Sequence, residues 1–413
     1  MNIWILNHYA HPPDLPGATR HYELAKDLAK CEHQVTIIAT SFHHYLHKET
    51  RLQPGENWKV EDLGSSQFVW IRTPPYQQND RQRVRNMIMF MVRAIRLSRK
   101  LPDLVPKIGK PDVVIGYSPH LLTPLAACWI AYRFHVPFVI EIADLWPQTI
   151  IDMGEFNSSH PVIKSLQALE KFLYQKADCI ITLLPFAHNY ITACGIPSEK
   201  VIWIPTGVDL SRFTEDTHEL ANHEFFQVMY LGAHGQANAL DVTIEAAKIV
   251  KEMGFGEIHF VFMGDGPEKT KLIALAKEFG LTNVEFRDPV PKKDVHNALR
   301  EADAFLFNLE DVAVFKYGIS PNKLFDYMIT GKPVITSVEA KGNPVEKARC
   351  GLIVPPRDPK ALAEALIKIY RMSPDEREEM GHRGQEYVKE HHDISKLAGL
   401  LEHTLTEVIE YRR

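Results

Sequence analysis

The sequence predicts an α/β protein built from two doubly wound domains. Short apolar runs rich in β-branched residues alternate with helical segments, and the alternation pauses near residue 207 and then restarts. The chain length of 413 residues also exceeds what one ordinary core holds. We predict domains over 1–206 and 207–385, followed by helices over 386–413 that pack back on the first domain.

The first domain is expected to hold a parallel sheet, because its β-branched runs resemble strands that are buried on both faces. A helix is predicted over 20–31, after a loop that contains Gly17 and Ala18. The predicted strands are 3–6, 35–39, 113–116, 138–142, 179–183 and 201–204.

The second domain repeats the pattern after a polar, irregular stretch over 211–224. Helices are predicted over 360 to the end of the chain. The other predicted elements are strands 227–231, 259–263, 284–286 and 304–308, helices 241–253, 268–279 and 294–301, and then a helix at Lys323 and a strand at Val334.

Composition excludes several classes of protein. The formal charge of −5 gives no excess of base for nucleic acid. The 5 cysteines are scattered without a C-x-x-C pair, which is typical of a reduced, cytoplasmic protein and not of a disulfide scaffold or zinc site. The N-terminus becomes polar too soon for a signal peptide, and the most apolar window, 121–132, is short and broken by Pro124. We expect a soluble or peripheral protein.

The segment 317–328 carries the clearest sign of a ligand site. Its Ser320-Pro321 pair predicts a turn in which Ser320 caps a helix and Pro321 takes the first helical position. Free backbone N–H groups at the helix start, with Lys323 beside them, would hold an anion such as a diphosphate. Asp326, one turn later, would accept hydrogen bonds from ribose hydroxyls. An ordinary capped helix with a surface Lys and Asp is the alternative reading of this segment alone.

Glycines follow the predicted strands of the second domain, where ligands of doubly wound sheets bind. Gly232, Gly264 and Gly266 would let backbone approach a ligand, although such glycines also occur in ordinary turns. A dinucleotide fingerprint is excluded because Lys269 stands where its next glycine belongs, and a P-loop is excluded because Pro333 follows Gly331-Lys332.

The order of these motifs resembles the retaining nucleotide-sugar glycosyltransferases of family 4, which have the GT-B fold of two Rossmann-like domains facing each other across a cleft. The resemblance covers nearly the whole chain and is strongest to the branch that builds bacterial O-antigens, capsules and exopolysaccharides. The motifs that carry it are the Pro-rich loop with Gly17-Ala18, the segments 141–147 and 204–209, Gly264-Asp265-Gly266-Pro267 and Ser320 to Met328.

The resemblance implies a donor site in the second domain and an acceptor site in the first. Gly17 and Ala18 would form an acceptor-side or phosphate loop. Three positions depart from the family pattern. Gly318 stands where an acidic residue contacts the donor sugar, so that its backbone N–H would replace part of that contact. Uncharged Ala233 and Asn238 replace an Arg and a Lys. The implied donor-binding residues are Gly232, His234, Asn238, Gly264, Gly266, Val290, Gly318, Ser320, Asn322, Lys323, Leu324 and Asp326.

The expected chemistry is departure of a nucleotide diphosphate from the anomeric carbon, with retention of configuration and with donors aimed at the growing phosphate charge. No Asp-x-Asp occurs, and solvent-facing or acceptor-side roles are expected for His43, His44 and His47, so no metal and no other cofactor is predicted. Asp144, Glu141, His120 and Lys323 are the catalytic candidates. A helix cap or core ion pair explains Asp144 and Glu141 equally well, and a buried structural role explains His120.

The stretch 81–102 contains six Arg, one Lys and no acidic residue before Pro102. Helical winding places Arg81, Arg85, Arg93, Arg96, Arg99 and Lys100 on one side and Met87, Phe90, Met91, Ile95 and Leu97 on the other. A basic amphipathic helix is typical of contact with an anionic membrane, and a helix that packs on the sheet with a solvated basic face is the alternative.

The prediction is a metal-independent transferase that moves a sugar, UDP-linked and N-acetylated in our first hypothesis, to a glycan or lipid-linked acceptor in surface polysaccharide synthesis. We place it in the cytoplasm, peripheral at the inner face of the membrane. Two alternatives stay open at this point: a GT-B sugar-nucleotide epimerase and a non-catalytic nucleotide-sugar-binding subunit.

Overall fold

The computed structural model describes residues 1–154, 156–213 and 225–412, and the chain divides into two compact units. Unit 1 consists of 1–12, 17–205 and 394–413, and unit 2 of 13–16 and 206–393. The linker boundary falls one residue before the predicted one, and the predicted segment 386–413 is divided, since 386–393 belongs to unit 2. Most of the stretch 211–224 that we expected to be irregular lies outside the described residues.

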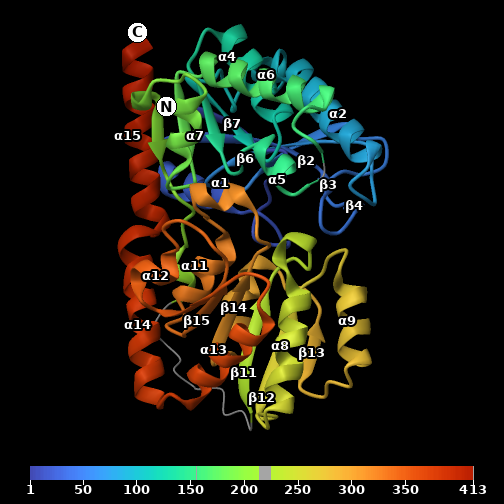
Figure 1. Ribbon diagram of the computed structural model, residues 1–413. Helices are drawn as coiled ribbons and strands as arrows, with labels where there is room; N and C mark the ends of the chain where they lie inside the picture. The colour runs from blue at the N-terminus through green and yellow to red at the C-terminus, as the bar shows by residue number, and fades with distance from the viewer. Residues whose placement is uncertain (155, 214–224, 413) are drawn as a thin grey trace. The chain divides into compact units, whose positions relative to one another are not determined.

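Unit 1 is an α/β layer structure whose strands are flanked by helices (Figure 1). Its elements are β1 (Asn2–Leu6), α1 (Arg20–Lys30), β2 (Gln34–Thr40), β3 (Phe42–His43), β4 (Lys48–Glu49), β5 (Trp58–Asp62), β6 (Gln67–Ile71), α2 (Arg81–Ser98), α3 (Leu101–Leu104), β7 (Val113–Ser118), α4 (Leu122–Phe134), β8 (Phe138–Ile142), α5 (Gln148–Asp152), α6 (Pro161–Lys176), β9 (Cys179–Thr182), α7 (Ala187–Ala193), β10 (Val201–Trp203) and α15 (Ile394–Arg412).

The sheet of unit 1 has the strand order β10-β9-β8-β7-β1-β2-β6-β5, and β5 alone runs antiparallel to its neighbour. Inward-facing residues such as Ile5 and Ile37 pack against α1 and α15 in one buried cluster. Helices α2 and α4 pack against each other and against β6 and β7. From β1 the chain first continues to β2 on one side of the sheet and later to β7 on the other side. The strand order therefore reverses at β1, and the side chains that follow β1, β2 and β7 meet at this switch point.

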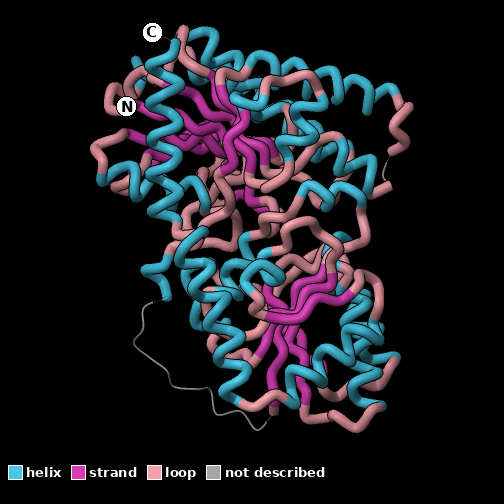
Figure 2. The backbone as a smooth tube through the Cα atoms, turned by 60° about the vertical axis from the view of Figure 1, so that its left-hand side comes forward, coloured by secondary structure: helices cyan, strands magenta, loops and turns pink. Residues whose placement is uncertain are grey.

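Unit 2 repeats the architecture around a parallel sheet, drawn in magenta in Figure 2. Its elements are β11 (Phe226–Leu231), α8 (Leu240–Glu252), β12 (Ile258–Met263), α9 (Lys269–Glu278), β13 (Val284–Arg287), α10 (Val295–Leu299), β14 (Ala304–Asn308), α11 (Asn322–Met328), β15 (Val334–Ser337), α12 (Pro344–Ala348), β16 (Gly351–Val354), α13 (Pro359–Arg371) and α14 (Pro374–His391).

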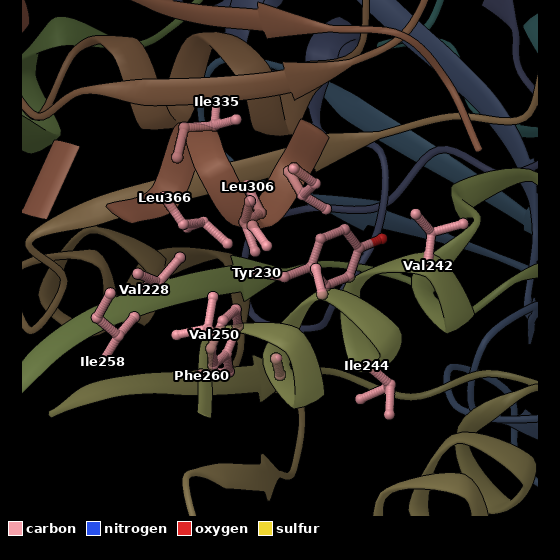
Figure 3. Packing of buried hydrophobic residues seen from close by; sticks show 14 of the residues in the cluster. Val228, Tyr230, Val242, Ile244, Val250, Ile258, Phe260, Leu306, Ile335 and Leu366 are labelled. Atoms are coloured by element: carbon pink, nitrogen blue, oxygen red, sulfur yellow. The ribbon is translucent and has the colours of Figure 1, made fainter. Parts of the chain in front are cut away.

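The sheet of unit 2 has the order β13-β12-β11-β14-β15-β16. On one face, Val228 and Phe260 pack with Ile244 of α8 and Leu366 of α13, and Figure 3 shows the ring of Tyr230 among these apolar side chains. The strand order reverses between β11 and β14, so the loops that follow these two strands form the switch point of unit 2. None of the described helices is both long and apolar enough to cross a membrane.

Candidate active site

Lys323 lies at the switch point of unit 2, where the sequence placed a diphosphate. It is the second residue of α11, and its ammonium Nζ donates to the hydroxyl of Tyr230 at 2.6 Å and to Oδ1 of Asn238 at 2.6 Å. Tyr230 comes from β11, and Asn238 from the loop that follows this strand. The helix therefore brings its cation to the carboxyl end of the central strand.

The partners of Lys323 are themselves fixed. The Tyr230 hydroxyl donates to the carbonyl of Ala233 at 2.7 Å, and Nδ2 of Asn238 donates to the same carbonyl at 3.0 Å. Asn238, which stands where the resemblance described above implies a Lys, thus orients the ammonium of Lys323. Tyr230 was missed by the sequence reasoning, although a Tyr inside a buried apolar strand needs a polar partner for its hydroxyl and signals such a site.

Lys323 is half-buried, and in the described residues no carboxylate lies within ion-pair distance of it. Its ammonium lies 4.6 Å from the ring centre of Tyr230 and 5.7 Å from that of Phe307. Burial lowers the pKa of Lys323 to about 7. An anion placed beside this ammonium would supply the missing negative charge and favour the protonated form.

The glycines at the strand ends are required by packing between neighbouring loops. A Cβ at Gly264 would lie 1.9 Å from the carbonyl oxygen of Gly232, and a Cβ at Gly266 would lie 2.5 Å from that of His234. Gly264 and Gly266 have φ values of +145° and +157°, which favour glycine. Their direct role is to let the loops after β11 and β12 touch, and the predicted ligand contact of these glycines stays a prediction.

The backbone of His234 and the side chain of Lys269 hold the same loops together, since the His234 N–H donates to the carbonyl of Asp265 at 2.8 Å. His234 is buried, and burial, followed by the charge of Lys269, lowers its pKa to about 4. Lys269, the residue that breaks the dinucleotide fingerprint, donates from Nζ to the carbonyls of Gly264 at 2.9 Å and Arg287 at 3.1 Å, and to the carboxylate of Asp288 at 3.1 Å. It therefore joins the ends of β12 and β13.

The turn before α11 differs from the prediction. Pro321, not Ser320, is the N-cap, and the helix begins at the exposed Asn322. The Ser320 hydroxyl instead accepts from the N–H of Thr206 at 3.0 Å, and the Ser320 carbonyl accepts from the Thr206 hydroxyl at 2.7 Å. The cap prediction was wrong because Thr206 reaches Ser320 from a part of unit 2 that is distant in sequence. The side chain of Leu324 is fully buried, and its predicted donor contact stays a prediction.

Gly318 has φ +91°, a value that favours glycine, and its N–H donates to the carbonyl of Phe315 at 2.9 Å. The turn already uses this N–H, and a contact between it and the donor sugar stays a prediction. Asp326 is buried and accepts a hydrogen bond from Lys292 in a close ion pair. Lys292, which the sequence reasoning missed, follows the half-buried Val290 in the loop after β13.

Glu141, a catalytic candidate, lies in a buried ion-pair network of unit 1. Its Oε1 accepts from Nε of Arg20 at 2.7 Å, and its Oε2 lies 2.6 Å from Nε2 of His21. Arg20 also donates to the carbonyls of Pro205 at 2.6 Å and Ile204 at 3.1 Å. Burial alone would raise the pKa of Glu141, but Arg20 and His21 outweigh it and lower the pKa to about 2. The geometry favours the core ion pair that the sequence left open.

His120 is also buried, at the switch point of unit 1. Its Nε2 lies 2.8 Å from Nδ1 of His8, which follows β1, and burial lowers the pKa of His120 to about 3. A neutral, buried His paired with a second His fits the structural reading. Asp144, in contrast, is exposed just after β8. Asp144 is therefore the candidate carboxylate of unit 1 that a substrate could reach.

The loop with Gly17 and Ala18 folds back on the chain after β1. Ala18 pairs with Ala10, its carbonyl accepts from the N–H of His11 at 3.1 Å, and a Cβ at Gly17 would lie 3.2 Å from the ring of His11. A ligand contact of this loop stays a prediction.

The three clustered histidines are less exposed than expected. His43 is fully buried, which corrects the solvent-facing alternative for this residue, and His44 and His47 are half-buried. Among the described residues, no group of three His, Cys, Asp or Glu side chains is placed to hold a metal ion.

Comparison with known protein families matches both halves of the chain. The "Glycosyl transferase 4-like domain" model matches residues 17–207, and the "Glycosyl transferases group 1" model matches residues 226–372. WcaL of Escherichia coli, named as a colanic acid biosynthesis glycosyltransferase, is 27% identical over 58% of this chain and 58% of its own length. WcaI of the same organism, similarly named, is 24% identical over 80% of this chain and 82% of its own length. The first of these matches thus spans little more than half of the relative.

Solved structures share the fold of the whole chain. Sucrose-phosphate synthase from Thermosynechococcus elongatus has a TM-score of 0.76 at 16% identity and covers 99% of both chains. HepE from Anabaena, solved in complex with UDP and glucose, has a TM-score of 0.67 at 12% identity, with 98% of this chain and 99% of that chain covered. At these identities the likeness shows the fold alone.

Proposed function

This chain belongs to the glycosyltransferases whose group 1 and 4-like domains it contains, with the GT-B fold, and from that premise we propose that it transfers a sugar from a nucleotide-diphosphate sugar to an acceptor in bacterial surface polysaccharide synthesis. The relatives with colanic acid names support the polysaccharide setting. Neither an epimerase nor a non-catalytic subunit is named among these relatives, so the transferase takes precedence.

The observation that carries the proposal is Lys323 at the switch point of unit 2. A half-buried ammonium with hydroxyl and amide partners, set at the start of a helix where strands end, matches the charge of a diphosphate. Asp326 would contact the ribose beside Lys292, and Val290 would lie against the base. We propose UDP as the nucleotide, which the UDP complex of HepE supports by fold only.

We further propose that transfer needs no metal and retains the anomeric configuration, as the resemblance to family 4 implies. The Lys323 ammonium would stabilise the charge that grows on the leaving diphosphate. The exposed carboxylate of Asp144 would orient or deprotonate the acceptor hydroxyl. Glu141 and His120 would support the fold of unit 1, given their buried partners.

A transfer assay tests this function. Radiolabelled UDP-N-acetylglucosamine and UDP-glucose are incubated with the protein, a lipid-linked acceptor extract and EDTA, beside the Asp144→Asn and Lys323→Met variants. We expect label in the acceptor fraction with the native protein and a loss of at least about 100-fold in each variant. Proton NMR of the product shows whether the anomeric configuration is retained. Release of a free epimer without acceptor would favour the epimerase instead.

We also propose that unit 1 contacts an anionic membrane through α2. The protein would then lie in the cytoplasm at the inner face of the membrane. Arg81, Arg85, Arg96, Arg99 and Lys100 are exposed together with Val84 and Ile88, which are 51% and 42% exposed. Arg93 is half-buried and donates to the carbonyl of Arg72 at 2.5 Å, so it is less available than the other cations. At the end of α2, a 430 Å³ pocket is lined by four cations together with the apolar side chains of Trp58, Ile71 and Leu97.

Vesicle sedimentation tests the membrane contact. Each cation near an anionic surface contributes about 1 kcal/mol, so Arg85→Glu should weaken binding to phosphatidylglycerol vesicles by roughly 10-fold or more. Lys360→Glu, on the exposed side of α13 in unit 2, is the matched charge reversal and should leave binding unchanged. Equal losses in both variants would point to net charge and not to α2.

A further inference from the structure

A second group of polar aromatic side chains lies at the carboxyl edge of the unit 1 sheet and is not used by the donor site. Tyr9 follows β1, His44 and Tyr45 form the turn between β3 and β4, Tyr76 follows β6, and Arg83 lies in the first turn of α2. Strands β1, β2 and β6 are neighbours in the sheet, so these five residues, here called the aromatic cluster, gather at one edge.

The rings of the aromatic cluster contact one another in a chain. The ring centres of Tyr9 and His44 are 5.0 Å apart, and those of His44 and Tyr45 are also 5.0 Å apart. Nδ1 of His44 lies 2.6 Å from the Tyr76 hydroxyl, and this hydrogen bond fixes the orientation of the imidazole. Tyr45 is 51% exposed, which is unusual for so large a ring. The cluster therefore offers ring faces to which the apolar face of a pyranose can stack.

Arg83 is the cation of the cluster. Its guanidinium carbon lies 5.9 Å from the ring centre of Tyr9, and one of its NH groups donates to Asn79 Oδ1 at 2.6 Å. In the described part of the chain, no carboxylate forms an ion pair with Arg83, and its buried Nε has no partner within hydrogen-bond distance. The Tyr9 hydroxyl lies beside the Arg83 guanidinium and the Tyr76 hydroxyl and interacts with both. Buried donors without partners are rare in native proteins and indicate a missing ligand or water.

Arg83 and Asp144 influence the ionisation of the rings in the aromatic cluster. Burial, followed by the charge of Arg83, lowers the pKa of His44 to about 3, so the imidazole is neutral at physiological pH. Burial raises the pKa of Tyr45, and the charges of Arg83 and Asp144 act on this pKa in opposite directions. A ligand on the ring of Tyr45 would thus lie near both a cation and a carboxylate.

We propose that the aromatic cluster is an acceptor subsite that selects an acceptor carrying an oxyanion, with the sugar ring stacked on Tyr45 and the oxyanion held by Arg83 and the Tyr9 hydroxyl. The subsite rests on the proposed transferase function and specifies its acceptor. Guanidinium binds carboxylate and phosphate with paired hydrogen bonds, and the buried Nε of Arg83 is a donor that has no partner within hydrogen-bond distance. The acceptor hydroxyl would then point toward Asp144, the proposed base. The oxyanion is either a uronate on the glycan or the diphosphate of a lipid carrier.

Saturation-transfer NMR with three probes tests the subsite: methyl β-D-glucuronide, methyl β-D-glucoside and farnesyl diphosphate. All samples contain saturating UDP, which occupies the Lys323 site. We expect an anionic probe to bind the native protein at least about tenfold more tightly than the glucoside, and Arg83→Gln to remove this preference. Arg133→Gln, an exposed arginine on α4, is the control and should keep it. Preference for the glucuronide identifies a glycan uronate, and preference for farnesyl diphosphate alone identifies the lipid carrier.

Three results would overturn the subsite: no preference for either anion, an unchanged preference in Arg83→Gln, or an equal loss in Arg133→Gln. Thermal unfolding of each variant verifies that the fold is intact, and Arg83→Lys should keep part of the preference. A separate UDP titration of each protein, prepared without UDP and without probe, reports on the donor site. Intact UDP binding without anion preference rejects the subsite and leaves the proposed function standing, whereas loss of UDP binding in the native protein rejects the proposed function itself.

Discussion

Lys323 is a cation whose pKa of about 7 makes ligand binding sensitive to pH. A diphosphate favours the protonated ammonium, so UDP affinity should fall as pH rises from 7 to 9, by at most about tenfold per pH unit. Calorimetric titrations between pH 6 and pH 9 measure this slope. In Lys323→Met the affinity should be lower by roughly 10- to 100-fold at pH 6 and nearly independent of pH above 7. An identical slope in both proteins would assign the titration to another group.

Glu141 should matter to stability before it matters to chemistry. Its pKa of about 2 lies below that of an unfolded glutamate, so its ion pair stabilises unit 1 above about pH 4.3 and loses this effect as pH falls toward 2. Glu141→Gln leaves Arg20 buried without its charge partner and should lower the free energy of unfolding by about 3–5 kcal/mol at neutral pH. Urea unfolding at pH 7 and pH 3 should show a smaller difference at pH 3. Normal stability with lost turnover would instead support a catalytic Glu141.

The glycines at the strand ends determine how closely two loops of unit 2 pack. A Cβ at Gly264 would lie 1.9 Å from the carbonyl oxygen of Gly232, at φ +145°, so Gly264→Ala must separate the loops after β11 and β12. We expect a loss of at least about 2 kcal/mol in stability and weaker UDP binding. Gly256→Ala is the control, because a Cβ there has nothing within 4 Å. Thermal unfolding of both variants decides the matter, and equal melting temperatures would contradict the loop packing.

Strands with continuous apolar runs could be predicted from the sequence nearly residue by residue, as β8 and β14 show. Strands β5 and β6 were missed. β5 has the partly exposed pattern of an antiparallel edge strand, and the turn signal Gly64-Ser65-Ser66 between the two strands was not used. Helix α11 was expected, but its cap was wrong, since the Thr206 contact to Ser320 joins residues that are 114 positions apart. Local patterns do not report such partners.

The candidate site shows the same division. Lys323 and Asp326 could be chosen from sequence because their motif is local. Their partners Tyr230 and Lys292 could not, because these residues reach the site only through sheet order and loop packing. Glu141 was ambiguous for the same reason: the carboxylate was visible at a strand end, whereas Arg20 lies 121 positions away from it.

The last helix of the chain, α15, packs on unit 1, the unit that contains the N-terminus. Leu397, Leu401 and Leu405 of α15 are at most 5% exposed and lie in one buried cluster with α1 and the unit 1 sheet. Deleting residues 394–413 should uncover this cluster at a cost of about 1.5–3 kcal/mol for each leucine and lower the melting temperature of unit 1. Scanning calorimetry should show the transition of unit 2 unchanged. Equal shifts of all transitions would contradict the division into units.

The central claim is that Lys323 at the carboxyl edge of unit 2 binds the diphosphate of a nucleotide sugar. The most direct measurement is calorimetric titration of UDP, GDP and ADP in EDTA into the native protein, Lys323→Met and Lys316→Met, the last being an exposed lysine before α11. We expect the native protein and Lys316→Met to bind UDP with equal affinity, and Lys323→Met to bind UDP roughly 10- to 100-fold more weakly. Unchanged UDP binding in Lys323→Met, or no binding of any diphosphate by the native protein, would contradict it.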